Sequence, residues 1–114
     1  MRRLDVSREA DLEAEEILRH SEAQFGPAAA DRYRLLIQSA YRDIAENPTR
    51  PGVSTLRGIP ADLRLYPVRH SRQRIAPADR VGQPRHVVAF RFDDARVEIV
   101  HLLHESMDLP RRLG

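Results

Sequence analysis

Apolar residues recur at helical spacing in the first half of the chain. When successive residues are turned by about 100°, the small and apolar positions between 10 and 25 fall on one narrow stripe. These positions are Ala10, Ala14, Ile17, Leu18, Ser21 and Phe25. Most acidic residues lie outside the stripe and gather in the first turns, where carboxylates complement the helix dipole. The pattern predicts a helix over 8–24, capped by Ser7 and preceded by a short strand at 4–6.

The same offsets recur in a second apolar stripe. Its members are Ala29, Tyr33, Leu36, Ile37, Ala40 and Ile44. Gly26-Pro27 separates the two stripes, and Pro27 suits the first position of a new helix. Asn47-Pro48 ends the second helix, because a residue before proline avoids the α region. Two helices joined by so short a link form an antiparallel helical hairpin.

The apolar pattern in the second half of the chain predicts strands. Residues 63–69 form a strand candidate, and Pro67 places it at a sheet edge or a bulge, since proline cannot donate to the ladder. Residues 86–92 alternate between apolar and polar positions, and Asp93-Asp94 signals a turn. Residues 97–103 are apolar on both faces, which is typical of a central strand.

The intervening segments carry little periodicity. Residues 48–62 and 71–85 are rich in proline, glycine and polar residues and are interpreted as loops, and residues 107–114 as a tail or short final helix. The element order is therefore β-α-α-β-β-β. We predict an α+β fold, a single domain over 1–114, with the helical hairpin packed on a small antiparallel sheet.

Composition narrows the class of protein. The chain has 114 residues, 41% hydrophobic and 32% charged, and it contains no apolar run long enough to span a membrane. Its first residues are too polar for a signal peptide. The absence of cysteine excludes a disulfide framework and any thiolate nucleophile or metal site. We expect a cytoplasmic protein.

The charges are unevenly distributed. Residues 57–96 carry nine arginines against four acids, whereas residues 1–56 carry eight against ten. Every basic residue is arginine, so no lysine can serve as a Schiff-base nucleophile or general base.

Several stretches in order resemble ParE-type toxins of the RelE/ParE superfamily over nearly the whole chain. The matching stretches are Ala10-Asp11-Leu12, Gln24-Phe25-Gly26, Ile44-Ala45-Glu46-Asn47-Pro48, Leu63-Arg64, Arg85-His86-Val87-Val88 and the segment from Val97 to Asp108. The ending His-x-x-Met-Asp, from His104 to Asp108, is the most specific. The sequence differs from the family pattern at residues 71–84, a segment longer than the tight hairpin that a minimal ParE-like chain has at this place.

The resemblance implies the toxin of a type II toxin–antitoxin system, neutralised by a cognate antitoxin that is ParD-like or similar. Characterised ParE-like members act on DNA gyrase, whereas RelE-like members cleave messenger RNA in the ribosome. Because both branches share a fold, the fold cannot choose between them. The resemblance favours a gyrase inhibitor without cofactor or membrane partner, touching DNA at most indirectly. A degenerate relative that keeps only antitoxin binding is a third alternative.

Catalytic chemistry has weak support in the residues. RNA cleavage by 2′-hydroxyl attack needs a base, an acid and a group that stabilises the phosphorane. RelE-like toxins are expected to use basic residues and a late tyrosine, but the tyrosines here, Tyr33, Tyr41 and Tyr66, all precede the last strand. Arg85, Arg91 and His104 are the alternative, a minimal RNase set. We expect no catalytic residues.

A metal site is not expected either. His101 and His104 lie three apart on a predicted strand, so their side chains should point to opposite faces. The pair also lacks a zinc-protease signature, because Glu105 follows the second histidine.

The arginine-rich region suggests a binding surface, the alternative being a solvated sheet edge. We predict that the target is contacted by Arg64, Arg69, Arg85, Arg91, His104, Met107 and Asp108. The antitoxin should lay a helix or extended segment along an apolar groove. For that groove we predict Tyr33, Tyr41 and Ile37, although Ile37, like Ile44, also fits the hairpin's core face. Tyr41 lies beyond the edge of the stripe, which favours it as a contact.

Overall fold

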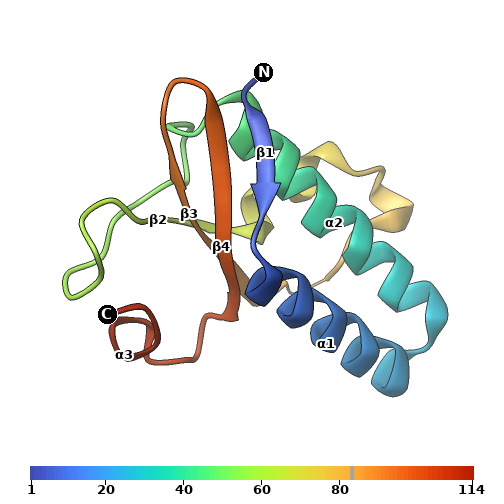
Figure 1. The fold of residues 1–114 in the computed structure, drawn as a ribbon. Helices are drawn as coiled ribbons and strands as arrows, with labels where there is room; N and C mark the ends of the chain where they lie inside the picture. Colours follow the sequence, from blue (N-terminus) through green and yellow to red (C-terminus); the bar gives the residue numbers. More distant parts are fainter. Residues whose placement is uncertain (83) are drawn as a thin grey trace.

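The computed structural model describes residues 1–82 and 84–114. A four-stranded sheet forms the middle layer, with the two long helices on one face and a short C-terminal helix on the other (Figure 1). The helices are α1 (Arg8–Phe25), α2 (Pro27–Glu46) and α3 (Leu109–Leu113). The strands are β1 (Arg3–Val6), β2 (Arg64–Pro67), β3 (His86–Phe92) and β4 (Arg96–His104). The α+β class and the helical hairpin are confirmed. In the described part of the chain no helix is long and apolar enough to cross a membrane.

The hairpin forms where the two stripes predict it. The Ser7 hydroxyl accepts the Ala10 N–H at 3.0 Å and caps α1. Gly26 links the helices with a φ of 93°, a left-handed value that costs other residues steric energy. Pro27 then begins α2. The predicted end at Asn47 is confirmed, since this residue is the C-cap of α2.

The sheet is mixed, which corrects the expected antiparallel sheet. Its strand order is β1-β4-β3-β2, with β1 parallel to β4 and the other pairs antiparallel. The predicted central position of the last strand is confirmed. Pro67 lies in the edge strand β2, as its missing N–H predicts.

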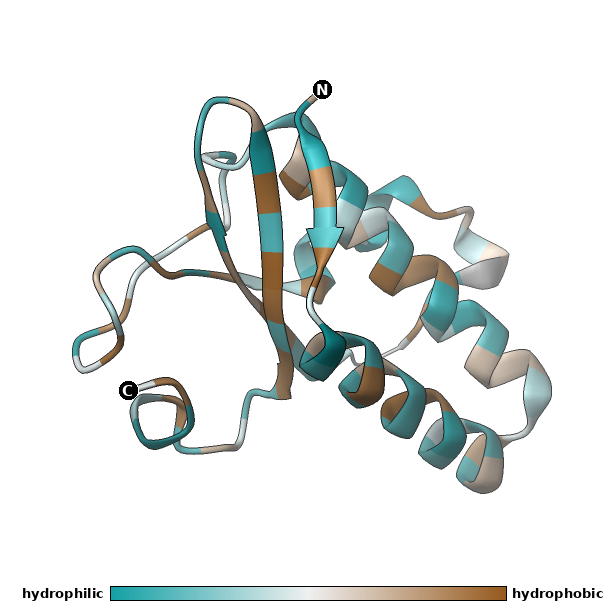
Figure 2. Ribbon diagram, in the orientation of Figure 1, coloured by the Kyte–Doolittle hydropathy of each residue, from teal (hydrophilic) through white to brown (hydrophobic). Residues whose placement is uncertain are grey.

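Each face of the sheet carries its own apolar cluster, and Figure 2 shows hydrophobic and hydrophilic residues alternating along β4. The main core lies between the sheet and the hairpin and includes Leu36, Ile44, Phe90 and Ile99. The second cluster lies on the other face, where α3 and the segment before β2 cover it. Its buried members are Leu63, Leu65, Val87, Ala89, Leu103 and Leu113.

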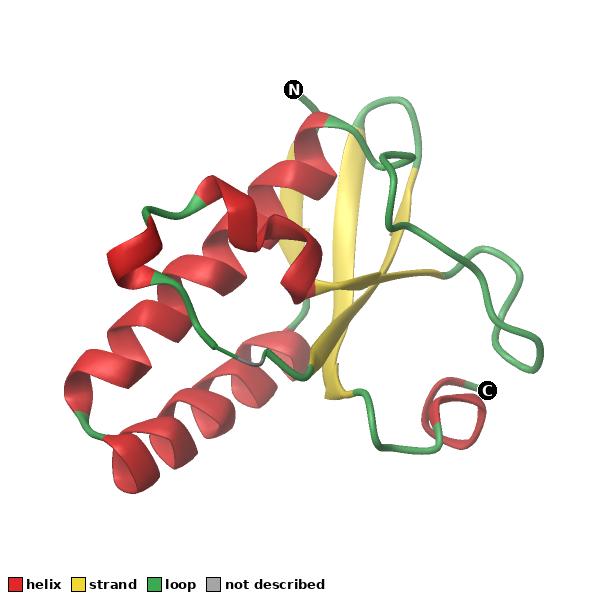
Figure 3. Ribbon diagram, turned by 180° about the vertical axis from the view of Figure 1, so that it is seen from behind, coloured by secondary structure: helices red, strands yellow, loops and turns green. Residues whose placement is uncertain are grey.

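The long connection between β2 and β3 is not an irregular loop throughout. It contains two 3₁₀ helices, η1 (Val68–Arg74) and η2 (Pro77–Asp79), where a loop was expected over 71–85. Figure 3 shows this segment beside the hairpin, on the side of α2. The composition did not reveal η1 because this 3₁₀ helix is held by contacts with α2 and not by a periodic pattern.

Candidate partner-binding site

A groove opens where the hairpin, the connection before β3 and the end of β4 meet. It encloses about 750 Å³, within the range of binding sites in proteins. Ile17, Phe25 and Ala29 line it from the hairpin, and Val81 lines it from the connection. Phe25 is 75% exposed, so the apolar surface extends into solvent at this end of the hairpin.

An aromatic cluster forms one wall of the groove. The Tyr33 hydroxyl lies 2.5 Å from His86 Nδ1, and the His86 ring packs edge-on against His104 with centroids 5.2 Å apart. Burial lowers the pKa of His86 to about 4 and raises that of Tyr33 to about 12. Both groups are therefore neutral near pH 7, with Tyr33 donating to His86.

Three arginines line the groove. Arg32 comes from α2, Arg80 from the connection, and Arg85 from the residue before β3. Arg80 Nε donates to the Ile75 carbonyl at 2.9 Å, which holds the connection in shape. Glu16 of α1 also lines the groove, and its carboxylate pairs with Arg19 at 2.6 Å. The lining of the groove is thus more basic than acidic.

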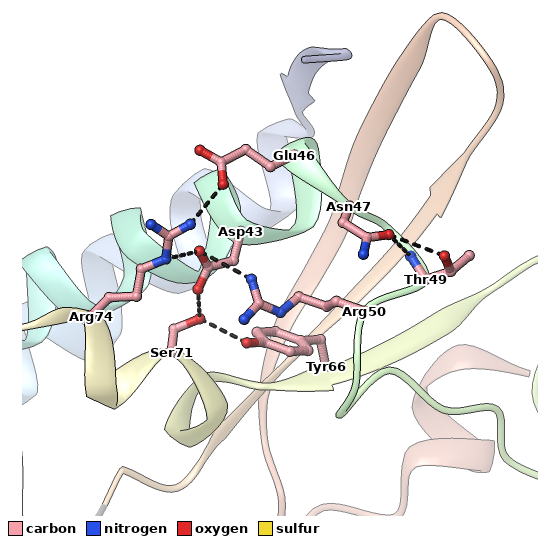
Figure 4. A network of polar contacts seen from close by, with 8 residues as sticks. All are labelled: Asp43, Glu46, Asn47, Thr49, Arg50, Tyr66, Ser71 and Arg74. Atoms are coloured by element: carbon pink, nitrogen blue, oxygen red, sulfur yellow. Dashed lines mark hydrogen bonds and ion pairs between the residues drawn. The ribbon is translucent and has the colours of Figure 1, made fainter.

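A buried polar network fixes the connection against α2 (Figure 4). The Asp43 side chain is fully buried and accepts the Ser71 hydroxyl at 2.6 Å, and Ser71 Oγ lies 2.8 Å from the Tyr66 hydroxyl. Arg50 pairs with the same carboxylate at 3.1 Å, and Arg74 pairs with both Asp43 and Glu46. Because η1 carries Ser71 and Arg74, this network positions the segment that leads to the groove wall.

The structure gathers some predicted target contacts at one end of the sheet. Arg69 and Arg85 both pair with Glu105, at 2.9 and 3.6 Å, beside a polar hollow of about 480 Å³. His104 lies at the same end of β4. Met107 follows it in the chain and is 40% exposed.

The remaining predicted target residues have other partners. Asp108 is the N-cap of α3 and accepts the Arg111 N–H. Arg64 donates to the carbonyls of residues 61 and 63. Arg91 pairs with Asp62 and Glu98, at 3.2 and 3.3 Å, away from His104. The suggested RNase set of Arg85, Arg91 and His104 is therefore not brought together.

Of the predicted antitoxin contacts, one lines the groove and two belong to the core or pack against it. Tyr33 lines the groove. Ile37 is only 4% exposed and belongs to the main core. Tyr41 packs against that core, and burial raises the pKa of its hydroxyl.

Sequence reasoning missed the groove's second wall. His86 can be recognised as a site residue only from the β3–β4 register, which pairs it with His104. Arg80 and Val81 lie in a segment interpreted as loop. Asp43 carried a detectable signal, a lone carboxylate one residue before the core position Ile44.

The two histidines of the His-x-x-His pair have separate partners. His101 Nδ1 lies 3.2 Å from both carboxylate oxygens of Glu13, whereas His104 packs against His86. Over residues 1–82 and 84–114, no three metal-binding side chains gather in one place.

Comparison with known proteins agrees with this geometry. A family profile described as the ParE toxin of the type II toxin–antitoxin system parDE matches residues 4–109. One similar solved structure belongs to the chromosomal ParDE toxin–antitoxin system of P. aeruginosa, with a TM-score of 0.69. The two chains are 13% identical, and the match covers 91% of this chain and 96% of the other. No curated protein sequence matches. This chain belongs to the ParE toxin family.

Proposed function

We propose that this protein inhibits DNA gyrase and is neutralised by an antitoxin encoded beside it. The observation that carries the proposal is the family match over residues 4–109. It supports gyrase as the target because characterised ParE-like toxins act on this enzyme. The protein would then act in the cytoplasm, where gyrase works on DNA, as a binding module without chemistry of its own.

The arrangement of charged residues supports binding over catalysis. Arg91 is paired at a distance from His104, and Arg85 and Arg69 are held by Glu105. We propose the end of the sheet around Arg69, Arg85, His104 and Met107 as the target surface. Its basic character suits a target that carries DNA.

Gyrase supercoiling and DNA cleavage assays with the purified protein test this function. Inhibition that the neighbouring antitoxin relieves is the expected result. Arg69→Glu should weaken inhibition, because it reverses a charge on the proposed surface, whereas Arg42→Glu on the exposed side of α2 should not. Full supercoiling at excess toxin would reject gyrase as the target.

Messenger RNA cleavage is the second candidate. The observation in its favour is that Tyr33, His86 and His104 cluster beside Arg85. A neutral imidazole in such a cluster can accept a proton from the attacking hydroxyl. Against it, His86 Nδ1 is already engaged by Tyr33. Arrest of a cell-free translation extract, with supercoiling untouched, would favour this candidate over gyrase inhibition.

A further inference from the structure

We propose that the groove beside the 71–84 segment receives an acidic, amphipathic stretch of the antitoxin and thereby sets which antitoxin this toxin accepts. This inference rests on the proposed neutralisation by an antitoxin. It concerns the part of the chain that is longer than in a minimal ParE-like chain. The longer connection supplies one wall of the groove through Arg80 and Val81.

The floor of the groove suits a large apolar side chain. Ile17 and Phe25 lie two turns apart on α1, and Ala29 faces them from the first turns of α2. Ala29 is small, which leaves room above α2. The strong exposure of Phe25 extends the apolar surface beyond the enclosed volume. An elongated apolar surface between helices is the form that accepts a helical or extended peptide.

The charges decide the chemistry of the partner. The groove is lined by three arginines, Arg32, Arg80 and Arg85, and no ion pair of Arg32 occurs within the described residues. Glu16 also lines it, but its carboxylate already pairs with Arg19 at 2.6 Å. An acidic stripe on the partner is therefore attracted to the groove, whereas a basic one is repelled.

Neutralisation follows from the position of the groove. Arg85 and His104 line the groove and also belong to the proposed target surface. A segment bound in the groove therefore covers part of the surface that would meet gyrase. Competition of this kind needs no change in the toxin's fold.

Matched substitutions on α2 test the proposal. Ala29→Trp fills the groove, and Ala28→Trp places the same side chain at the neighbouring exposed position outside it. Arg32→Glu reverses a charge in the groove, and Arg42→Glu does so further along the same helix. Affinity is measured by titration calorimetry with the purified antitoxin encoded beside the toxin gene. Each free variant is also assayed for gyrase inhibition.

We expect Ala29→Trp and Arg32→Glu to weaken antitoxin binding about tenfold or more, as when a central pocket of an interface is blocked. The two controls should bind like the wild type, and all four free variants should inhibit gyrase like the wild type. Among overlapping peptides of the antitoxin, the strongest binder should carry a large apolar side chain flanked by carboxylates. Its affinity should fall with added salt.

Three other results would overturn the proposal. Unchanged antitoxin affinity of Ala29→Trp would place the interface elsewhere. Loss of gyrase inhibition with intact antitoxin binding would make the groove a target site, and preference for neutral or basic peptides would contradict its charge. A wild-type toxin that binds the antitoxin without inhibiting gyrase would reject only the target, whereas one that does not bind the antitoxin would reject the proposed function as well.

Discussion

Asp43 is the residue on which the packing of the connection depends most. A fully buried carboxylate is costly to desolvate, and here Ser71, Arg50 and Arg74 compensate for that cost. A network of this kind adds little stability relative to an apolar core, but it fixes one arrangement of its members. Removing Asp43 takes away an acceptor that the other members share, which is where the energetic penalty lies.

Asp43→Ala should therefore lower the free energy of unfolding by about 1–3 kcal/mol, since it removes the acceptor of the buried Ser71 hydroxyl and of the partly buried Arg50, whereas Arg74 keeps its pair with Glu46. Urea denaturation measures the change. Asp31→Asn on the same helix is the control, because Asp31 pairs with Arg34 at the surface and such a pair contributes about 1 kcal/mol or less. Equal losses for the two variants would show that the Asp43 network does not stabilise the fold.

His86 should make stability depend on pH. Its pKa is about 4 in the folded protein, against an ordinary value of 6.5, because burial disfavours the charged ring. As the pH falls from 6.5 toward 4, the unfolded chain takes up a proton that the folded chain does not, so stability is lost in that window. His86→Gln removes the proton uptake. Urea denaturation at about pH 7 and about pH 5 should show a smaller loss for this variant than for the wild type; an identical loss would contradict the assignment.

At the scale of elements, two side chains at the start of α1 bind the backbone of β4. The Ser7 hydroxyl, just before α1, donates to the Val100 carbonyl at 2.7 Å, and Glu13 Oε1 accepts the Leu102 N–H at 3.0 Å. Strand β1 pairs with β4 only as far as Ile99, so beyond that residue β4 has no neighbouring strand on the side of β1 among the residues that the structure describes. Glu13 supplies an acceptor there.

Glu13→Ala should cost about 1–3 kcal/mol of unfolding free energy, because the N–H of Leu102 loses its acceptor in a partly buried place. Glu13→Gln keeps a carbonyl oxygen at that position and should cost less. Glu15→Ala, at an exposed position of the same helix, is the control for helix propensity. Amide hydrogen exchange at Leu102 gives the local readout, and unchanged protection in Glu13→Ala would refute the role of this contact.

The elements also show what the sequence can predict. Both helices and their ends followed from apolar periodicity, Pro27 and Asn47-Pro48, because these signals act within a few residues. The edge position of β2 followed from Pro67 for the same reason. The direction of β1 could not be predicted, since its pairing with β4 joins residues such as Leu4 and Val97 that are far apart in the chain. The 3₁₀ helix η1 was missed because Asp43, on a different element, holds it through Ser71 and Arg74.

For the molecule as a whole, the two apolar clusters determine where a partner can bind. The hairpin covers one face of the sheet, and α3 with the segment before β2 covers the other. Neither face of the sheet is therefore free to serve as a broad interaction surface. What remains open is the end of the sheet near His104 and the adjoining groove. Tyr33, His104 and Arg85 could be proposed from the sequence, but their convergence required the fold.

The covering of the second face gives a prediction of its own. A helix of five residues such as α3 has almost no stability alone, so it depends on burying Leu113 against the sheet. Leu113→Glu places a charge in that contact and should release α3, at a cost of about 1.5–3 kcal/mol from the lost burial. Leu63 and Leu103 would then face water, and binding of a hydrophobic dye should rise. Arg112→Glu, exposed on the same helix, should change neither stability nor dye binding. If Leu113→Glu behaved like this control, the second cluster would not need α3, and the outer face of the sheet would have to be considered as a binding surface.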